Sequence, residues 1–300
     1  MRGLRLGFQT TRLLSPDLAL RMAERLFCLP RRHRTPEAEL AAGRNGQPFA
    51  FRSQGFLLQG RIWGEGPPVA LLHGWEGRGT QFHAFLEPLL AAGYSAVAFD
   101  EPAHGASQGR FAGPLEWSQA IGAFAREVGP LHGVVAHSLG APALAIALDQ
   151  GLLELPRAVF LAPPAEPDIF YSGLLSMLGL PERDHAQAFE AFGARIGIPW
   201  DRIRLRSLAP RRSTALLVIH DRQDRDVPWE SGATVASVWP GARLLLTEGL
   251  GHRRILRDPQ VIEQTVAFLG QAPTSAALPF HGEGPRSLEW HLFHRELRTA

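Results

Sequence analysis

Short apolar runs alternate with helical patterns along most of this 300-residue chain. Runs typical of buried strands lie at residues 69–72, 95–99, 134–137, 158–161, 215–219 and 242–246. Helical patterns at residues 80–92, 115–128, 141–148 and 259–269 lie between or after them. Residues 48–63 predict two further strands that are joined by a turn. This alternation predicts an α/β fold, in which helices cover both faces of a mostly parallel central sheet.

The composition is that of an ordinary globular chain, with 45% hydrophobic and 20% charged residues. No stretch of about 18 apolar residues is present, so we expect no stable membrane anchor. The N-terminus also lacks the apolar run and cleavage site of a secretory signal. A single cysteine, Cys28, excludes an internal disulfide and a multi-cysteine zinc site. These features favour a cytoplasmic location.

All 31 basic residues are arginine, and the chain contains no lysine. Mechanisms that need a lysine are therefore excluded, including Schiff-base catalysis, P-loop phosphate binding and Ser-Lys dyads. The net charge is only +2. Residues 1–34 are locally basic and could contact anionic lipid or nucleic acid. We favour a solvated helical extension for this segment and expect no nucleic-acid partner.

The pattern divides the chain into three parts. Residues 1–46 predict an N-terminal helical extension, and residues 271–300 predict a tail that is partly helical or disordered. Between them, residues 47–270 form the α/β domain. Its longest insertion, at about residues 163–210, follows a strand and contains two helical patterns. It is equally compatible with a lid over a site and with a packing subdomain that has no gating role.

The most informative motif is Ala136-His137-Ser138-Leu139-Gly140. A predicted strand precedes it and a predicted helix follows it. Small residues on both sides of a serine at such a junction are typical of a nucleophile elbow, which lifts the hydroxyl above the edge of the sheet. The motif therefore predicts that Ser138 forms a covalent acyl intermediate.

A serine nucleophile needs a base and an acid that orients the base. His252 follows the last predicted strand, and Asp224 follows the strand before it. Asp221 and Asp226 are alternatives to Asp224, although solvated loop charge or helix capping explains them equally well. The order Ser, Asp, His is that of α/β-hydrolases.

Four motifs together resemble the α/β-hydrolase superfamily over about residues 47–270. The resemblance is to its lid-bearing branch of esterases, lysophospholipases and serine-aminopeptidase-like proteins. The motifs are Leu72-His73-Gly74-Trp75, the loop from Asp100 to Gly109, the serine motif at 136–140, and Asp224-x-x-Val227-Pro228 with Gly251-His252. Ala136 departs from the glycine that the family carries at this position, but alanine is also small.

The resemblance implies a role for each matching residue. Ser138 would be the nucleophile, His252 the general base and then acid, and Asp224 the group that orients His252. The backbone N–H groups of Trp75 and Leu139 would form the oxyanion hole.

Other residues are weaker candidates. His137 could contact substrate together with Trp75, whereas His73 and His104 are better explained as structural histidines. The aspartates at 221–226 lack the glycine and distal glutamate of a calcium loop, and no Gly-x-Gly-x-x-Gly motif follows a strand. We therefore expect neither a metal nor a cofactor.

The sequence thus predicts a serine hydrolase that cleaves a carboxylic ester, thioester or amide of a small, partly hydrophobic molecule. Two other hypotheses remain open. One is a binding protein without catalytic activity on the same fold. The other is an acyltransferase or a carbon–carbon hydrolase with the same triad. Neither the substrate nor the oligomeric state follows from the sequence.

Overall fold

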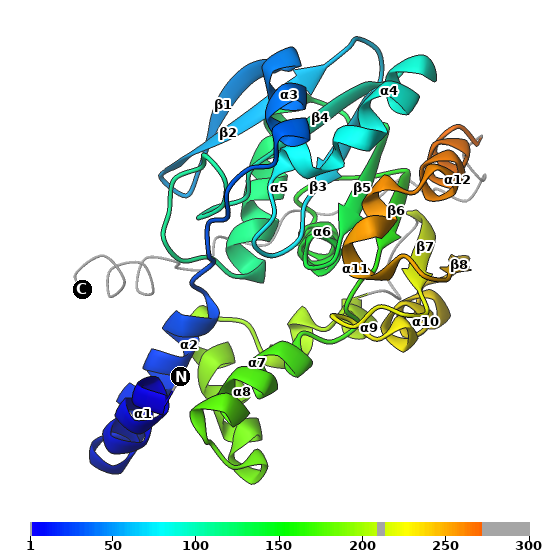
Figure 1. Ribbon diagram of the computed structural model, residues 1–300. Coiled ribbons are helices and arrows are strands. Elements are labelled where there is room, and N and C mark those ends of the chain that lie inside the picture. Colours follow the sequence, from blue (N-terminus) through cyan, green and yellow to red (C-terminus); the bar gives the residue numbers. More distant parts are fainter. Residues whose placement is uncertain (1, 209–213, 272–300) are drawn as a thin grey trace.

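The computed structural model describes residues 2–208 and 214–271, and a single sheet of eight strands lies at its centre (Figure 1). The strand order is β1-β2-β4-β3-β5-β6-β7-β8. The strands are β1 (Gln47–Ser53), β2 (Phe56–Trp63), β3 (Pro68–Leu72), β4 (Ser95–Phe99), β5 (Gly133–His137), β6 (Arg157–Leu161), β7 (Ala215–Asp221) and β8 (Arg243–Thr247). β2 pairs antiparallel with β1 and β4, and the pairs from β4 to β8 are parallel. The predicted α/β fold is confirmed, because a mostly parallel sheet is what the alternating pattern required.

Helices cover both faces of the sheet because the strand side chains alternate between two cores. Ala70 and Leu72 of β3 pack into one core, while Val69 and Leu71 pack into the other. The first core carries α5 (Pro114–Val128), α6 (Gly140–Asp149) and α10 (Trp229–Val238). The second carries α4 (His83–Ala91) and α12 (Pro259–Leu269), with the short 3-10 helix η1 (Gly79–Phe82) before α4.

Three helices precede the sheet: α1 (Arg2–Leu14), α2 (Pro16–Phe27) and α3 (Glu37–Asn45). The Ser15 side chain caps α2 by accepting a hydrogen bond from the N–H of Leu18 at 3.4 Å. The buried face of α2 is not its most apolar stripe, because Leu18 is 52% exposed whereas Ala19 and Ala23 are fully buried. The small alanines allow close approach of the neighbouring helices, which a count of hydrophobic residues does not reveal.

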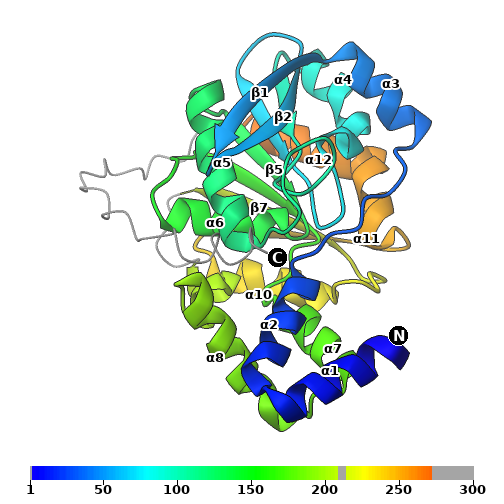
Figure 2. The same ribbon diagram turned by 90° about the vertical axis from the view of Figure 1, so that its left-hand side faces the viewer.

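The insertion between β6 and β7 is also helical. It contains α7 (Asp168–Leu178), η2 (Glu182–Asp184), α8 (His185–Ile196), η3 (Trp200–Ile203) and α9 (Leu205–Leu208). Figures 1 and 2 show that α7 and α8 lie beside α1 and α2, away from the sheet. We call α1, α2, α7, α8 and η3 together the cap. The cap therefore combines the N-terminal segment with the insertion, two segments that are far apart in sequence.

Ion pairs hold the two segments of the cap together. Arg195 of α8 binds the buried Glu24 of α2 through two nitrogens and also reaches Asp17 at 2.9 Å. Arg12 of α1 contacts Asp184 at 2.7 Å. All of these bonds join side chains more than 170 positions apart in the sequence.

An aromatic cluster fills the centre of the cap. Phe27 of α2 lies 5.0 Å from Tyr171 of α7 and 6.1 Å from Phe192 of α8, measured between ring centroids. Trp200 of η3 stacks on Phe189 at 4.9 Å. Rings from four elements therefore share one contact region, which gives the cap an apolar centre of its own.

No helix among residues 2–208 and 214–271 is long and apolar enough to cross a membrane. Most of the predicted tail, residues 272–300, lies outside the described residues.

Candidate active site

Polar side chains from distant parts of the sequence lie beyond the carboxyl ends of the central strands. Ser138 follows β5, Asp224 follows β7, and His252 lies in the short helix α11 (Gly251–Arg254) after β8. The sheet places β5, β6, β7 and β8 side by side and parallel, so their carboxyl ends lie along the same edge. This is where open α/β sheets carry their functional groups.

Ser138 lies in a sharp turn between β5 and α6. Its φ angle is +50°, a left-handed conformation that is rare for a residue with a side chain. The Ser138 N–H donates to the carbonyl of Leu161 at 2.9 Å. A side chain at Gly140 would lie 2.8 Å from the His73 carbonyl oxygen. Close packing thus requires the glycine and holds the serine in a strained position.

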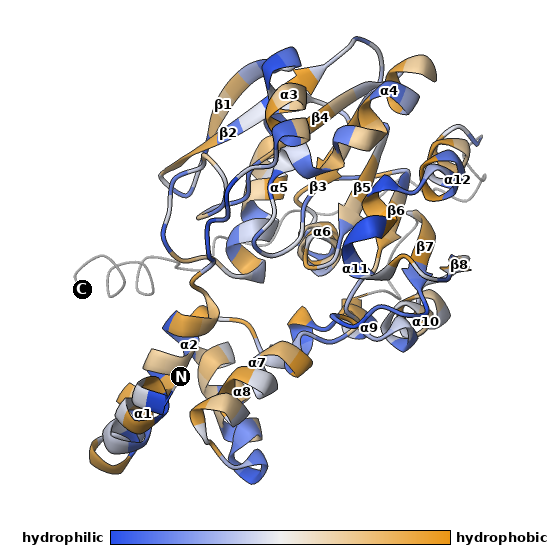
Figure 3. Cartoon of the chain, in the orientation of Figure 1, coloured by the Kyte–Doolittle hydropathy of each residue, from blue (hydrophilic) through white to orange (hydrophobic). Residues whose placement is uncertain are grey.

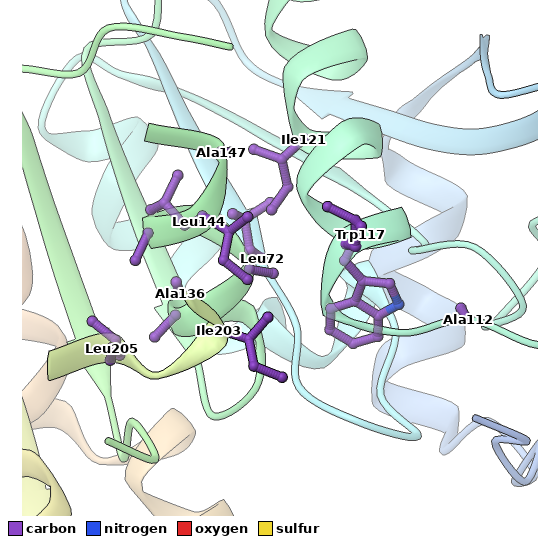
Figure 4. Close-up of a cluster of buried hydrophobic side chains, with 14 of the residues drawn as sticks. Leu72, Ala112, Trp117, Ile121, Ala136, Leu144, Ala147, Ile203 and Leu205 are labelled. Carbon is purple, nitrogen blue, oxygen red and sulfur yellow. The ribbon is translucent and has the colours of Figure 1, made fainter. Parts of the chain in front are cut away.

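Ala136, the departure from the family pattern, lies fully buried in β5. It pairs with Leu72 of β3 and belongs to the core beneath α6. Figure 4 shows it with Leu72, Leu144 and the α5 residues Trp117 and Ile121. The alanine methyl therefore occupies space within this core.

Two backbone N–H groups flank this turn. Leu139 immediately precedes α6, and Trp75 lies in the loop after β3. Neither N–H donates a hydrogen bond to any residue within 2–208 or 214–271. Gly74 fixes the distance between the two loops, since a Cβ there would lie 2.8 Å from the Cβ of Ser138.

His252 and Asp224 form a direct pair. The Nδ1 of His252 lies 2.7 Å from Oδ2 of Asp224. The other carboxylate oxygen accepts hydrogen bonds from the N–H groups of Asp226 at 2.8 Å and Val227 at 2.9 Å. The carboxylate is therefore held from both sides, and its position determines the orientation of the imidazole.

The other two aspartates of this loop have different surroundings. The Asp221 carboxylate accepts from Thr247 Oγ1 at 2.9 Å and from the Leu250 N–H at 3.0 Å. It thereby joins β7 to the loop after β8. Asp226 is exposed, and its side chain has no partner among residues 2–208 and 214–271. Of the three, only Asp224 reaches His252.

His220 is a residue that the sequence analysis did not single out. It is fully buried at the end of β7, and its Nε2 lies 3.0 Å from the Val227 carbonyl and 3.4 Å from Oδ2 of Asp224. Burial favours the neutral carboxyl, but the bonds from His220, His252 and Val227 outweigh it and lower the pKa of Asp224 below its usual range. One indication in the sequence places His220 near the site: it directly precedes Asp221 at the end of a strand.

His137 lies next to His252 and binds its backbone. Its Nε2 donates to the backbone carbonyl of His252 at 2.9 Å, and its Nδ1 accepts from Gln81 at 3.4 Å. Burial lowers the pKa of His137 to about 3, so the ring is neutral and carries the single proton that this arrangement needs. His137 lines the cavity, but its hydrogen bonds join it to the protein.

A buried cluster lies behind the loop of Trp75. The Nδ1 of His73 donates to the Gly74 carbonyl at 2.7 Å, and its Nε2 accepts from the Glu101 N–H at 2.9 Å. The His104 ring contacts the rings of His73 and Trp75, with centroid distances of 5.3 and 4.9 Å. These bonds and contacts give His73 and His104 structural roles.

The chain between α2 and α3 lies against the same loop. The Arg31 N–H and the His33 ring both donate to the Glu76 carboxylate, at 3.0 and 2.9 Å. Arg78 in turn donates to the His33 carbonyl at 3.1 Å and pairs with Glu39 at 3.0 Å. The N-terminal segment is therefore attached to the loop that follows β3.

A cavity of about 1070 Å³ separates the cap from the sheet edge. Its wall includes the site residues Trp75, His137, Ser138, Leu139 and His252. Both segments of the cap also line it, for example through Phe27 and Leu174. Among residues 2–208 and 214–271, no group of three or more His, Cys, Asp or Glu side chains is arranged to hold a metal ion.

Comparison with solved structures shows the same architecture in other proteins. The esterase of Exiguobacterium antarcticum has a TM-score of 0.61 at 17% identity, over 75% of this chain and 100% of its own. A bromoperoxidase from Bacillus anthracis has a TM-score of 0.60 at 16% identity, over 74% and 99%. An esterase from Pyrococcus furiosus has a TM-score of 0.57 at 18% identity, over 80% and 98%.

A comparison with curated proteins gave no match. The model of the alpha/beta hydrolase family matches residues 69–265, which run from β3 into α12 and include Ser138, Asp224 and His252. With this match and the shared architecture, the chain belongs to the α/β-hydrolase family.

Proposed function

We propose that this protein is a serine hydrolase that cleaves carboxylic esters. The observation that carries the proposal is the bond between His252 and Asp224, with the strained Ser138 on the wall of the same cavity. A serine, a base and an orienting acid are the three groups that acyl transfer through a serine requires. Esterases among the similar structures agree with this chemistry.

In the proposed reaction, His252 removes the hydroxyl proton of Ser138 as the oxygen attacks the ester carbonyl. The tetrahedral intermediate collapses, His252 returns the proton to the departing alcohol, and the acyl group remains on Ser138. Water then attacks the acyl-enzyme with His252 again as base, which releases the carboxylic acid and restores the serine.

Two features would stabilise the charges that develop. Asp224 stays ionised, because its pKa is lowered, and it would stabilise the imidazolium form of His252. The free N–H groups of Trp75 and Leu139 would bind the oxyanion, and losing one such donor typically costs about 3–4 kcal/mol of barrier. His137 and His220 would act as positioning residues, through the His252 carbonyl and the Asp224 carboxylate.

The cap would cover this site. We propose that residues 47–270 are the hydrolase domain and that the insertion at 163–210 serves as its lid, with residues 1–46 as an extension. Phe27 and Leu174 on the cavity wall agree with a substrate that is partly hydrophobic.

A fluorophosphonate probe tests the assignment of the nucleophile. Wild-type protein should become labelled on one serine, and Ser138→Ala should abolish the labelling. Ser176→Ala is the matched control, because it removes an exposed serine of α7 and should leave labelling unchanged. Equal labelling of wild type and Ser138→Ala would contradict the assignment of Ser138, and no labelling of wild type would favour a binding protein without catalysis.

A further inference from the structure

The cavity wall carries unpaired positive charge. Arg34, Arg225, Arg253 and Arg257 line it and are exposed. None of their four side chains makes a hydrogen bond or ion pair with any residue of 2–208 or 214–271. They come from the segment before α3, the loop after β7 and the chain around α11, so three separate parts of the fold supply them.

The acidic residues of the cavity do not balance these arginines. Glu39 is paired with Arg78, and Glu76 is bound by Arg31 and His33. Asp226 is the remaining acid among the described lining residues. The wall therefore holds an excess of cationic groups that are available to a ligand.

Abundant arginine alone does not explain this excess. The chain contains almost as many acidic as basic residues, 29 against 31. In the cap, arginines form ion pairs with acidic residues: Arg12 pairs with Asp184, and Arg195 with Glu24. Near the site, Arg225 directly follows Asp224 and Arg253 directly follows His252, and neither arginine side chain has such a partner among the described residues.

Another part of the cavity wall, contributed by the cap, is apolar. The N-terminal segment contributes Leu26 and Phe27, and α7 contributes Phe170, Leu174 and Met177. Figure 3 shows the contrast, with α7 largely hydrophobic and α11 strongly hydrophilic. Such a wall suits a single hydrocarbon chain, because burying each methylene contributes about 0.8 kcal/mol.

We propose that the substrate is an anionic amphiphile: an ester of one apolar acyl chain whose alcohol part carries a phosphate or carboxylate. The chain would lie in the cap, and Arg34, Arg225, Arg253 and Arg257 would bind the anion. This inference rests on the proposed function, because the ester would be cleaved by water at Ser138. Acyl chain and anionic alcohol would leave as separate products.

Three esters with the same dodecanoyl chain test the charge. They are monododecanoyl glycerol, its 3-phosphate, and the dodecanoyl ester of glyceric acid, which carries a carboxylate. We expect kcat/KM for at least one anionic ester to exceed that for the neutral ester about tenfold or more, since charged hydrogen bonds contribute more than neutral ones. The preferred anion identifies the head group.

The variant Arg34→Glu with Arg257→Glu tests the residues. The ratio of kcat/KM for the preferred anionic ester over the neutral ester should fall about tenfold or more. The variant Arg34→Gln with Arg257→Gln should lower this ratio by a smaller factor. It provides the same test if the charge-reversed variant does not fold. Arg52→Glu with Arg126→Glu is the control, because both arginines are exposed and lie outside the cavity. It should keep the wild-type ratio.

A second pair of variants tests the apolar part of the wall. Leu174→Trp should lower kcat/KM for the dodecanoyl ester relative to a butanoyl ester with the same head group by roughly tenfold, because the larger ring fills the chain site. Ile169→Trp, also on α7 but outside the cavity wall, should leave that ratio unchanged.

The outcomes separate the two proposals. If the neutral ester is hydrolysed and Ser138 is labelled, but anionic esters have no advantage, the substrate inference is overturned and the hydrolase remains. The same conclusion follows if the anionic preference survives the charge reversal. If no ester is hydrolysed and Ser138 is not labelled, both proposals are overturned.

Discussion

The strand ends and the cap are held by different kinds of interaction. At the strand ends, backbone geometry dominates: Ser138 has a positive φ, and Gly140 touches the backbone of a neighbouring strand. In the cap, side chains dominate, since Arg195 and Phe27 join helices that are remote in sequence. The first region leaves little freedom to change, whereas the second can vary as long as its partners vary together.

This difference separates the groups proposed for bond cleavage from the residues proposed to bind the acyl chain. The groups proposed to break the bond lie on rigid strand ends, where a small displacement is costly. The residues proposed to hold the acyl chain, such as Phe27 and Leu174, lie on the cap helices, whereas three of the four arginines proposed to bind the anion lie beside the strand ends. Substitutions in the two regions should therefore affect different measurements, and three predictions test this from the largest effect to the smallest.

Asp224→Asn should lower kcat by about 10⁴-fold, and it should also lower the unfolding free energy at pH 7, because the folded protein stabilises the ionised carboxylate. An asparagine amide has one oxygen, whereas the carboxylate uses one oxygen for His252 and the other for the Val227 N–H. If the amide oxygen accepts from Val227, its NH₂ group faces His252, and the imidazole loses the acceptor that orients it. Steady-state kinetics and urea unfolding give the two numbers. Asp226→Asn, which changes a carboxylate that does not reach His252, should alter kcat less than about tenfold. A similar loss in both variants would contradict the role of Asp224.

Arg195→Ala should destabilise the cap by about 3–5 kcal/mol, because it leaves the buried carboxylate of Glu24 without its partner. Hydrogen exchange should show lost protection in α2 and α8, with strands β3 and β5 unchanged. The double variant Arg195→Ala, Glu24→Ala should recover part of the loss, since no unpaired charge remains. Equal loss of protection in the sheet would show that cap and core unfold as one unit.

Glu101→Gln should stabilise the protein by about 1 kcal/mol or more at pH 8 and less at pH 5. Glu101 is fully buried, its carboxyl oxygens have no hydrogen-bond partner in the described part of the chain, and burial raises its pKa well above the usual range.

The sign follows from proton binding. The unfolded chain loses the Glu101 proton near pH 4.5, whereas the folded protein loses it only at its higher pKa. Stability therefore falls as the pH rises from about 4.5 toward the pKa of the folded protein. Glutamine removes this dependence. Urea midpoints at both pH values measure the effect, and Glu127→Gln on the exposed side of α5 is the control. An unchanged pH dependence in Glu101→Gln would contradict the assignment.

The sequence predicted the sheet well, because most strands are short apolar runs that end at polar or loop-forming residues. The helix predicted at 80–92 is in fact a 3-10 helix followed by α4. The pairing of His252 with Asp224 also agrees with the spacing of the loop, since Val227 binds the carboxylate through its N–H.

The cap could not be predicted in the same way. Its contacts are single ion pairs and ring contacts between residues such as Arg195 and Glu24, and helical periodicity carries no information about which helix a charged residue meets. The buried face of α2 is built on Ala19 and Ala23, which no hydrophobic stripe marks. His220 was missed because a histidine inside a buried strand has no motif of its own.

The composition of the cap from two segments has a consequence for protein engineering. Transplanting the insertion alone into a relative would leave Tyr171 and Phe192 without Phe27, and Arg195 without Glu24. The N-terminal helices would have to move with it, together with the stretch that binds Glu76. Recombination of this protein with others of the same architecture therefore has a minimum exchangeable module, and that module is discontinuous in the gene.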